Sequence, residues 1–372
     1  MIRARPSTTD LDTAFECSHA VRLSSRQWII VGILLLALTA LAPKAWERFE
    51  AFEPGPDYRV PYDLSNDYWL YQRHCQHIHR QQRIAVVGDS VIWGHYVSPD
   101  QTLTHHLNEL AGEERFANLG LDGTHPAALY GLLNHYADRL AGTTVVVHFN
   151  PLWLTSKKHD LQTTKEFHFN HPKLVPQFGS DIPCYRAPWS QRLWAVVQQR
   201  VPFYAWTSHL RTAYYDSTTL QSWTLEHPYA CPLPVPDPDR LMPAPGRRFP
   251  AQPLGPDARK QDVAWVDLES SIQWRFFRRS VALLKRRGNE VFVLVGPFNE
   301  HVLSDRAKSA HDDIRKTIES WLRENNVPHL ISPALPPNLY VDTSHPVGPG
   351  YAILARQLLA HTAFQEATKT EK

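Results

Sequence analysis

The sequence has few cysteines and methionines and no excess of either sign of charge. Its 372 residues include only four cysteines, which excludes a disulfide-dense scaffold, and only two methionines. Neither sign of charge dominates, because 39 Lys and Arg face 37 Asp and Glu, and this balance gives no support for nucleic-acid binding. No regular internal spacing is present, so we expect neither a solenoid nor a propeller.

The residues that are abundant indicate a folded chain with irregular additions. Hydrophobic residues make up 43% and charged residues 20%, which is typical of a globular protein rather than a disordered one. The 30 prolines, 20 histidines and 12 tryptophans are high counts. They predict an aromatic-rich elaboration on a globular core.

One long apolar run stands near the N-terminus. Residues 28–42 carry no charge, and extending the run to residues 27–46 gives a helix of about 30 Å, the thickness of a bilayer core. Trp28 and Trp46 would then lie at the two interfaces. We therefore expect an uncleaved transmembrane anchor over 27–46 after an N-terminal tail over 1–26. A cleaved signal peptide and a buried core helix are the alternatives.

Charges beside this run favour one orientation. Arg22 and Arg26 precede it directly, so we expect the tail inside the cell and the bulk of the chain outside, in the periplasm. An exported domain would permit a disulfide. Cys184 and Cys231 lie in proline-rich segments and are the two cysteines that would pair there, although the sequence alone does not decide it.

Buried-strand and helix patterns alternate after a linker and lead-in over 47–82. Strand patterns fall at 83–88, 116–121 and 143–149, with helical spacing at 99–111 and 126–140 between them. This alternation predicts an α/β fold with a parallel sheet. It stops over 156–262, where ten prolines occur between positions 228 and 256. We expect a proline- and aromatic-rich insertion, or cap, with short helices at 189–200 and 203–215.

The alternation resumes after the insertion. Helices are expected over 267–287, 303–324 and 350–361, with strands at 291–296 and 328–332. The α/β core is thus predicted as two segments, 83–155 and 263–362, followed by a C-terminal tail over 363–372.

Two short motifs carry the residues of a serine nucleophile and its base. Gly88-Asp89-Ser90 follows a strand and precedes a helix, so Ser90 is expected at the carboxyl edge of the sheet, where ligands bind. Asp342 stands three residues before His345, just before the last helix. The carboxylate can orient the imidazole, which can take the proton of Ser90. Either motif alone is also an ordinary turn.

Two further positions offer hydrogen-bond donors to an oxyanion. A glycine in the segment 118–124, after the second strand, can bring a backbone N–H close to a substrate oxygen. Asn150 ends the third strand and offers a side-chain amide.

In its order of Ser, Gly, Asn and Asp-x-x-His, the chain resembles the SGNH hydrolases, also called the GDSL family. The resemblance covers about 145 residues and includes Pro346 and Gly350-Tyr351 after the histidine. It implies a flavodoxin-like three-layer fold. It also implies a catalytic triad and an oxyanion hole, formed respectively by Ser90, Asp342 and His345, and by Ser90, Asn150 and Gly123 (with Gly120 as the second choice). The family's G-x-N-D block reads His148-Phe149-Asn150-Pro151 here, and Val91 replaces its usual leucine.

The resemblance implies acyl-ester chemistry without a cofactor or metal. With the anchor, the arrangement is similar to envelope enzymes that act on exported polysaccharides. We expect an esterase or an O-acyltransferase whose substrate is an acylated glycan, with a membrane acyl-donor protein as a further candidate partner. Asn299 and His301 follow a strand at the same edge and are candidate substrate-binding residues.

Two other classes of protein stay open. One is a catalytically silent module of the same fold that binds a carbohydrate or a partner. The other is a metal protein, suggested by the histidines and the cysteine within residues 74–79 and by His105-His106.

Overall fold

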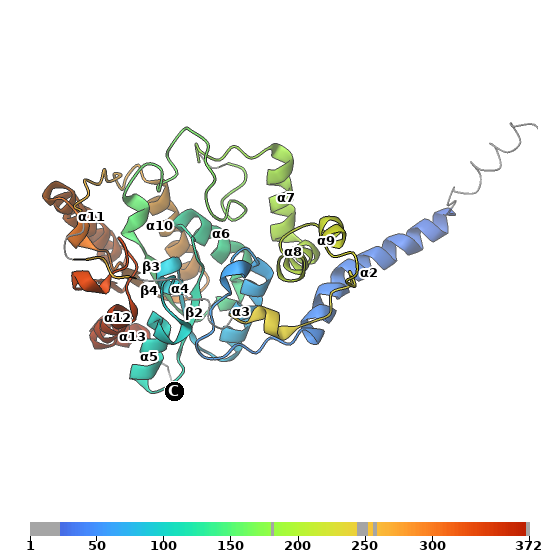
Figure 1. Cartoon of the computed structure of the whole chain (residues 1–372), viewed down its shortest axis with the longest axis horizontal. Helices are drawn as coiled ribbons and strands as arrows, with labels where there is room; N and C mark the ends of the chain where they lie inside the picture. Colours follow the sequence, from blue (N-terminus) through green and yellow to red (C-terminus); the bar gives the residue numbers. More distant parts are fainter. Residues whose placement is uncertain (1–22, 180–181, 244–251, 256–258, 370–372) are drawn as a thin grey trace, which may run out of the picture. The chain divides into compact units, whose positions relative to one another are not determined.

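The computed structural model describes residues 23–179, 182–243, 252–255 and 259–369 (Figure 1). The chain divides into two compact units, residues 1–48 and 49–372. Most of the predicted N-terminal tail, three short parts of the insertion and the end of the C-terminal tail lie outside the described residues.

The first unit contains one apolar helix, α2 (Ser25–Phe49), which is three residues longer at its C-terminal end than the predicted anchor. The helix is long and apolar enough to cross a membrane. Large apolar side chains such as Leu36 are more than half exposed along it, so it is not the core helix of a soluble domain. A signal sequence near the N-terminus can be equally long and apolar, so a signal peptide stays an alternative to the anchor.

The second unit is built on a five-stranded sheet in which every neighbouring pair is parallel. The strand order is β2-β1-β3-β4-β5. The strands are β1 (Ile84–Gly88), β2 (Phe116–Gly120), β3 (Thr144–Phe149), β4 (Glu290–Val295) and β5 (His329–Ile331). Each lies within one or two residues of a strand expected from the sequence, so the predicted parallel α/β fold is confirmed.

Helices of the second unit precede, connect and follow these strands. They are α3 (Tyr68–Arg80), α4 (Ser90–Trp93), α5 (Leu103–Ala111), α6 (Pro126–Tyr136), α7 (Trp189–Arg200), α8 (Pro202–Tyr214), α9 (Leu220–Glu226), α10 (Ile272–Arg286), α11 (Asp305–Glu324), α12 (Gly348–Ala360) and α13 (Thr362–Ala367).

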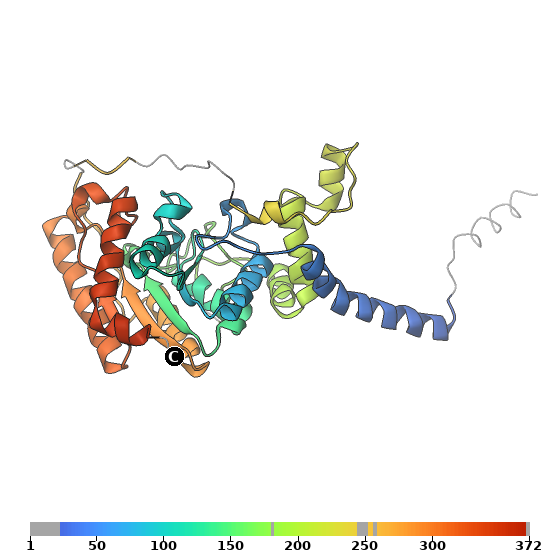
Figure 2. The same ribbon diagram turned by 90° about the horizontal axis from the view of Figure 1, so that it is seen from below.

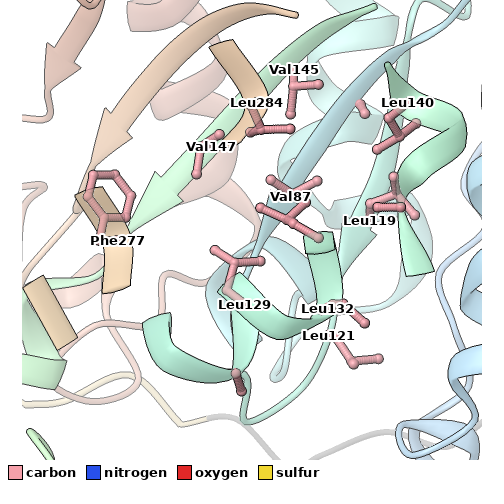
Figure 3. Close-up of a cluster of buried hydrophobic side chains, with 14 of the residues drawn as sticks. Val87, Leu119, Leu121, Leu129, Leu132, Leu140, Val145, Val147, Phe277 and Leu284 are labelled. Atoms are coloured by element: carbon pink, nitrogen blue, oxygen red, sulfur yellow. The ribbon is translucent and has the colours of Figure 1, made fainter. Parts of the chain in front are cut away.

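Alternate residues of the strands feed two hydrophobic cores, one on each face of the sheet. Val87 and Val147 pack with side chains of α3, α6, α10 and α11, and part of this cluster is drawn in Figure 3. Val86 and Val146 point the other way and pack with α4, α5, α12 and α13. Burying each such side chain stabilises the fold by about 1.5–3 kcal/mol. Helices on both faces are compatible with the three-layer arrangement that the resemblance implies.

The strand order places a switch point between β1 and β3. The chain winds to one side of β1 to form β2 and to the other side to form β3, β4 and β5. Ligands of open α/β sheets bind at such a point, outside the carboxyl ends of the strands. Gly88 and Phe149 end the two strands there, immediately before the Asp89-Ser90 pair and Asn150.

The predicted linker over 47–82 is wrong for its second half. Helix α3 occupies residues 68–80, and Leu70, Tyr71, Cys75 and Ile78 are fully buried in the core. Asp67 caps the helix by accepting from the Leu70 N–H at 3.0 Å. The histidines of this stretch conceal its apolar spacing, since His74 is itself buried between the apolar positions. The core of the second unit therefore begins before residue 83.

The C-terminal tail is also shorter than predicted. Residues 362–367 form α13, and Phe364 is fully buried against Phe116 and Phe292.

The insertion has two parts. Its first part joins the main body, because Leu161, Val175 and Cys184 pack with Phe276 of α10. Its second part forms α7, α8 and α9, at the end of the unit opposite α11–α13 (Figures 1 and 2). Cys184 is buried and Cys231 is exposed, and both are free thiols, so the disulfide that the sequence permitted is not formed.

A buried cluster of charges fastens α8 to the body of the unit. His209 of α8 lies between two carboxylates, with Nδ1 2.6 Å from Asp67 and Nε2 3.1 Å from Glu50. Arg73 pairs with Glu50 at 2.6 Å, and the Tyr214 hydroxyl donates to the same carboxylate. Two positive and two negative groups thus balance one another away from water.

The two carboxylates beside His209 keep its imidazole protonated. Burial alone would lower its pKa, but Asp67 and Glu50 outweigh burial and raise the pKa to about 9. The imidazolium therefore stabilises the fold fully below pH 6.5, the ordinary value, and this contribution is lost as the pH rises through about 9.

We expect His209→Leu to lower the free energy of unfolding at pH 7 by about 3–5 kcal/mol, because Glu50 and Asp67 lose a buried counter-charge. The deficit should shrink at pH 10, where the wild-type histidine is neutral. Denaturant unfolding of the full chain, followed by tryptophan fluorescence, measures both. His227→Leu removes an exposed histidine of the same region and should change little. Equal effects of the two substitutions would contradict the charge cluster.

Candidate active site

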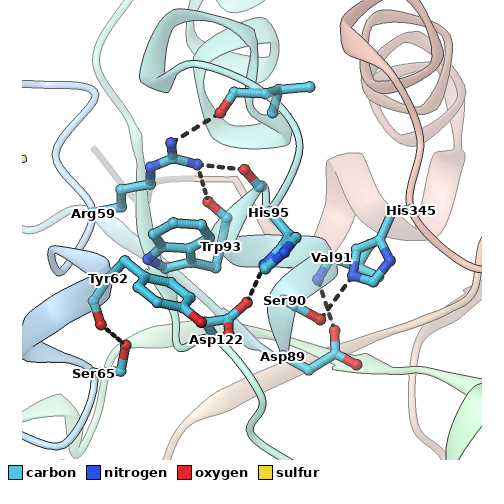
Figure 4. Close-up of polar contacts among 12 residues, drawn as sticks. Arg59, Tyr62, Ser65, Asp89, Ser90, Val91, Trp93, His95, Asp122 and His345 are labelled. Carbon is cyan, nitrogen blue, oxygen red and sulfur yellow. Dashed lines mark hydrogen bonds and ion pairs between the residues drawn. The ribbon is translucent and has the colours of Figure 1, made fainter. Parts of the chain in front are cut away.

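The predicted nucleophile and base meet at the switch point of the sheet. Ser90 is the first residue after Asp89 at the end of β1, and His345 lies in the loop before α12. His345 Nε2 lies 2.8 Å from Ser90 Oγ (Figure 4). The two residues are 255 positions apart in the sequence. Only the fold brings them together.

Asp342 holds the other side of the imidazole. Its carboxylate oxygens lie 2.8 and 2.9 Å from His345 Nδ1. The same carboxylate accepts from the backbone N–H groups of Ser344 and His345, each at 2.9 Å. The three-residue spacing closes a local turn around the carboxylate, as the sequence suggested, and fixes the orientation of the ring.

The protonation of this pair follows from its contacts. Burial alone would lower the pKa of His345, but the hydrogen bond and charge of Asp342 outweigh it and raise that pKa above its ordinary value. Burial alone would raise the pKa of Asp342, but His345 outweighs it, and the pKa of the carboxyl is lowered. An anionic Asp342 thus stabilises the protonated imidazole, the state that follows proton transfer from a serine.

Asp89 is a buried carboxylate with several partners at the site. It is buried and accepts from the Val91 N–H at 3.0 Å, from Asn150 Nδ2 at 2.8 Å and from Trp153 Nε1 at 3.1 Å. His148 Nδ1 lies 3.2 Å from the same carboxylate. Asp89 therefore ties the end of β1 to the end of β3.

The charge of Asp89 is kept by these partners. Burial alone would raise its pKa, but His148 and the donated hydrogen bonds outweigh burial and lower it. Gly88 makes room for this pairing, since a Cβ there would stand 2.8 Å from His148 Cβ and 2.5 Å from a side-chain carbon of Ile92.

The predicted oxyanion donors differ in how they are held. Asn150 is buried, and its side-chain oxygen accepts from the Leu152 N–H at 3.0 Å while its amide donates to Asp89. An amide nitrogen carries two hydrogens, so a second can be donated. Gly123 has a φ of +71°, which favours glycine, and lies against the Asn170 amide.

Gly120, the second choice for the oxyanion glycine, has a different part. Its N–H donates to Asn118 Oδ1 at 2.9 Å, and a Cβ at Gly120 would stand 2.3 Å from the backbone nitrogen of Trp93. It allows α4 to pack closely on β2. Because its N–H is already used, Gly123 stays the predicted donor.

The structure shows contacts of Asn299 and His301 with neighbouring loops of the protein. Asn299 is 1% exposed, and its amide donates to the Asp342 carbonyl at 3.2 Å. Its N–H donates to the Thr343 carbonyl at 2.8 Å. His301 Nε2 lies 2.9 Å from the Leu335 carbonyl oxygen. Asn299 thus braces the loop that carries Asp342, and its part in substrate binding stays a prediction.

One feature expected beside Ser90 is smaller than predicted. The helix after Gly88-Asp89-Ser90 is α4, which has four residues and ends at Gly94 with a φ of +83°. A single turn supplies a weak dipole, so stabilisation of negative charge would rest on individual N–H groups.

A second His–Asp pair, which no motif of the sequence indicates, lies beside the first. His95 Nδ1 lies 2.5 Å from Asp122 Oδ1, and the His95 ring lies 5.7 Å from that of His345, centre to centre (Figure 4). Tyr96 packs edge-on against His345 at 5.3 Å. Only the neighbouring Gly-Asp-Ser motif marks this stretch in the sequence.

Residues 74–79, which suggested the alternative of a metal protein, do not gather as a ligand set. His74 Nε2 lies 3.1 Å from the Asn118 carbonyl in the core. Among the described residues, two groups have ligand atoms close enough for a metal, namely His105, His106 and Glu109, and Glu300, His311 and Asp312. Glu300 is already paired with Arg315 at 2.6 Å, and His105 with Asp57 at 3.0 Å.

We expect Asp89→Asn to lower the free energy of unfolding by about 3–5 kcal/mol, since His148 loses its buried partner and the new amide faces donors from Asn150 and Trp153. Asp313→Asn, at a side chain that is 73% exposed, is the matched control and should cost under about 0.5 kcal/mol. Denaturant titration of both variants measures the difference. Similar stability of the two would contradict a structural role for the Asp89 contacts.

Two comparisons with known proteins find no relative of this chain. No family model matches the chain, and no curated protein matches it. The function is therefore inferred from the arrangement of the residues themselves.

Proposed function

We propose that the protein is a serine-dependent acyl-ester enzyme of the SGNH type. The observation that carries the proposal is the position of His345, which lies 2.8 Å from Ser90 Oγ on one side and 2.8 Å from Asp342 on the other. A hydroxyl, an imidazole and a carboxylate in this order are the parts needed to activate a serine. Their place at the switch point of a parallel sheet supports the same conclusion.

The first half of the proposed reaction transfers an acyl group to the protein. Ser90 Oγ attacks the ester carbonyl while His345 Nε2 takes its proton. The backbone N–H groups of Ser90 and Gly123 and the Asn150 amide would stabilise the oxyanion of the tetrahedral intermediate. When the intermediate collapses, the alcohol leaves with the proton from His345, and the acyl group stays on Ser90.

The second half releases the acyl group. Water or a hydroxyl of a second molecule attacks the acyl-serine, gives its proton to His345, and the proton returns to Ser90 as the new product leaves. With water the protein is an esterase, and with a sugar hydroxyl it is an O-acyltransferase. We propose an acylated envelope or exported polysaccharide as substrate, since a helix able to span a membrane adjoins this domain in the chain. If the protein is a transferase, a membrane acyl-donor protein would supply it with the acyl group.

We expect Ser90→Ala to reduce hydrolysis of an aryl acetate by the full chain in detergent at least about 10³-fold. Ser222→Ala removes an exposed hydroxyl from α9 and should leave the rate unchanged. Release of the aryl alcohol is followed by absorbance. Mass spectrometry with an added oligosaccharide then separates hydrolysis from transfer. If the wild type and Ser90→Ala were equally inert on aryl and sugar esters, a silent binding module would be the better conclusion.

The pH dependence of kcat/KM tests the role of Asp342. Because the pKa of His345 is raised and the neutral imidazole is the active form, activity should fall as the pH drops through a midpoint above 6.5, the ordinary value. Asp342→Asn should lower this midpoint and reduce the rate by about 10³–10⁴. An unchanged midpoint in Asp342→Asn would contradict the coupling between the two residues.

A further inference from the structure

A polar pocket opens beside the candidate active site. Its volume is about 320 Å³, within the range of about 300–1,000 Å³ that is usual for small-molecule sites. It is lined by residues from three separate segments, namely Tyr62, Ser65, Asn66, Asp122, Phe169, Asn170, His171 and Pro172. Two of these segments are the predicted lead-in and the predicted cap.

The His95–Asp122 pair connects the pocket to Ser90. Asp122 lines the pocket, and His95 packs against both Tyr62 and His345, with ring centres 6.2 and 5.7 Å away. Figure 4 shows His95 between Asp122 and the Ser90–His345 pair. Asp122 also directly precedes Gly123, the predicted oxyanion donor. If part of a ligand binds in the pocket, the adjoining part of the same ligand would therefore lie near Ser90.

The lining of the pocket selects a type of ligand. The exposed amides of Asn66 and Asn170 can each donate and accept hydrogen bonds, which suits hydroxyl groups. Tyr62 is 36% exposed and, with the half-buried Phe169, offers aromatic surface to the apolar face of a ring.

The charges of the residues that line the pocket indicate which charge its ligand has. None of the residues that line the pocket is a lysine or an arginine, and its carboxylate, Asp122, is paired with His95 at 2.5 Å. The nearby Arg59 guanidinium donates to the carbonyl groups of Trp93, Gly94 and Val97. An anionic ligand would meet Asp122 and no lining cation, so the pocket favours a neutral one.

The segment that closes the pocket is held in place before any ligand binds. His171 Nε2 lies 2.7 Å from the Asp122 carbonyl oxygen, and its Nδ1 lies 3.0 Å from the Tyr68 hydroxyl. His125 Nε2 lies 3.2 Å from the Asn170 carbonyl oxygen. These contacts fix residues 170 and 171 against the body of the unit, which reduces the entropy that binding would cost.

We propose that this pocket binds a neutral sugar ring of the glycan that donates or accepts the acyl group. Tyr62 stacks on the ring, Asn66 and Asn170 form hydrogen bonds with its hydroxyls, and the His95–Asp122 pair lies between the ring and Ser90. The identity of the ligand rests on the proposed function, but its binding does not require catalysis.

The test measures binding by the full chain in detergent, in a Ser90→Ala background that leaves any sugar ester intact. The probes are neutral gluco-, manno-, galacto- and xylo-oligosaccharides, each plain and O-acetylated, with an oligomer of a uronic acid for comparison. We expect at least one neutral probe to bind more tightly than the uronic acid. Tyr62→Ala and Asn170→Ala should each weaken that binding by at least about tenfold.

Tyr229→Ala is the matched control, because Tyr229 is a fully exposed aromatic residue of the cap away from the pocket lining. Thermal unfolding of each variant verifies that it is folded. The pocket proposal is overturned if no neutral probe binds, if the uronic acid binds more tightly, or if Tyr62→Ala behaves like Tyr229→Ala. Tyr62-dependent sugar binding without Ser90-dependent ester hydrolysis would instead overturn the proposed function and leave the pocket proposal standing.

Discussion

The buried carboxylate of Asp89 is the contact on which the candidate site depends. It accepts hydrogen bonds from the start of α4 and from Asn150 and Trp153 after β3, and it pairs with His148 within β3. Ser90, the predicted nucleophile, is one residue away and is therefore held in a fixed position relative to the predicted oxyanion amide. A charge out of water is costly unless it is paired, and this one has enough partners to stay ionised.

The same physical solution appears twice in the molecule. At the site, Asp89 lies against His148, and where α8 meets the body of the unit, Glu50 and Asp67 pair with His209 and Arg73. Both clusters join segments that are far apart in the chain. Hydrophobic contacts would tolerate small shifts of those segments, whereas paired charges of fixed geometry specify one arrangement. Asn299, by bracing the loop of Asp342, does similar work with neutral groups.

The sequence predicts the sheet and the order of the site residues well, because local signals mark them. Val86, Val146 and Val293 lie in short apolar runs, Asn150 follows such a run directly, and Ser90 follows one after Asp89. The sequence fails where a residue's role depends on a distant partner. The partners of His95, His148 and His209 are between 27 and 159 positions away or lie on other elements, so nothing nearby in the chain reveals them. Helix α3 was missed because a buried histidine interrupts its apolar pattern.

Because Ser90 and His345 are far apart along the chain, they are synthesised at different times. Ser90 is made 255 positions before His345. A growing chain therefore carries the hydroxyl group before it has the imidazole that would activate it in the proposed reaction. The proposed acyl chemistry would begin only once the loop before α12 has brought His345 beside Ser90.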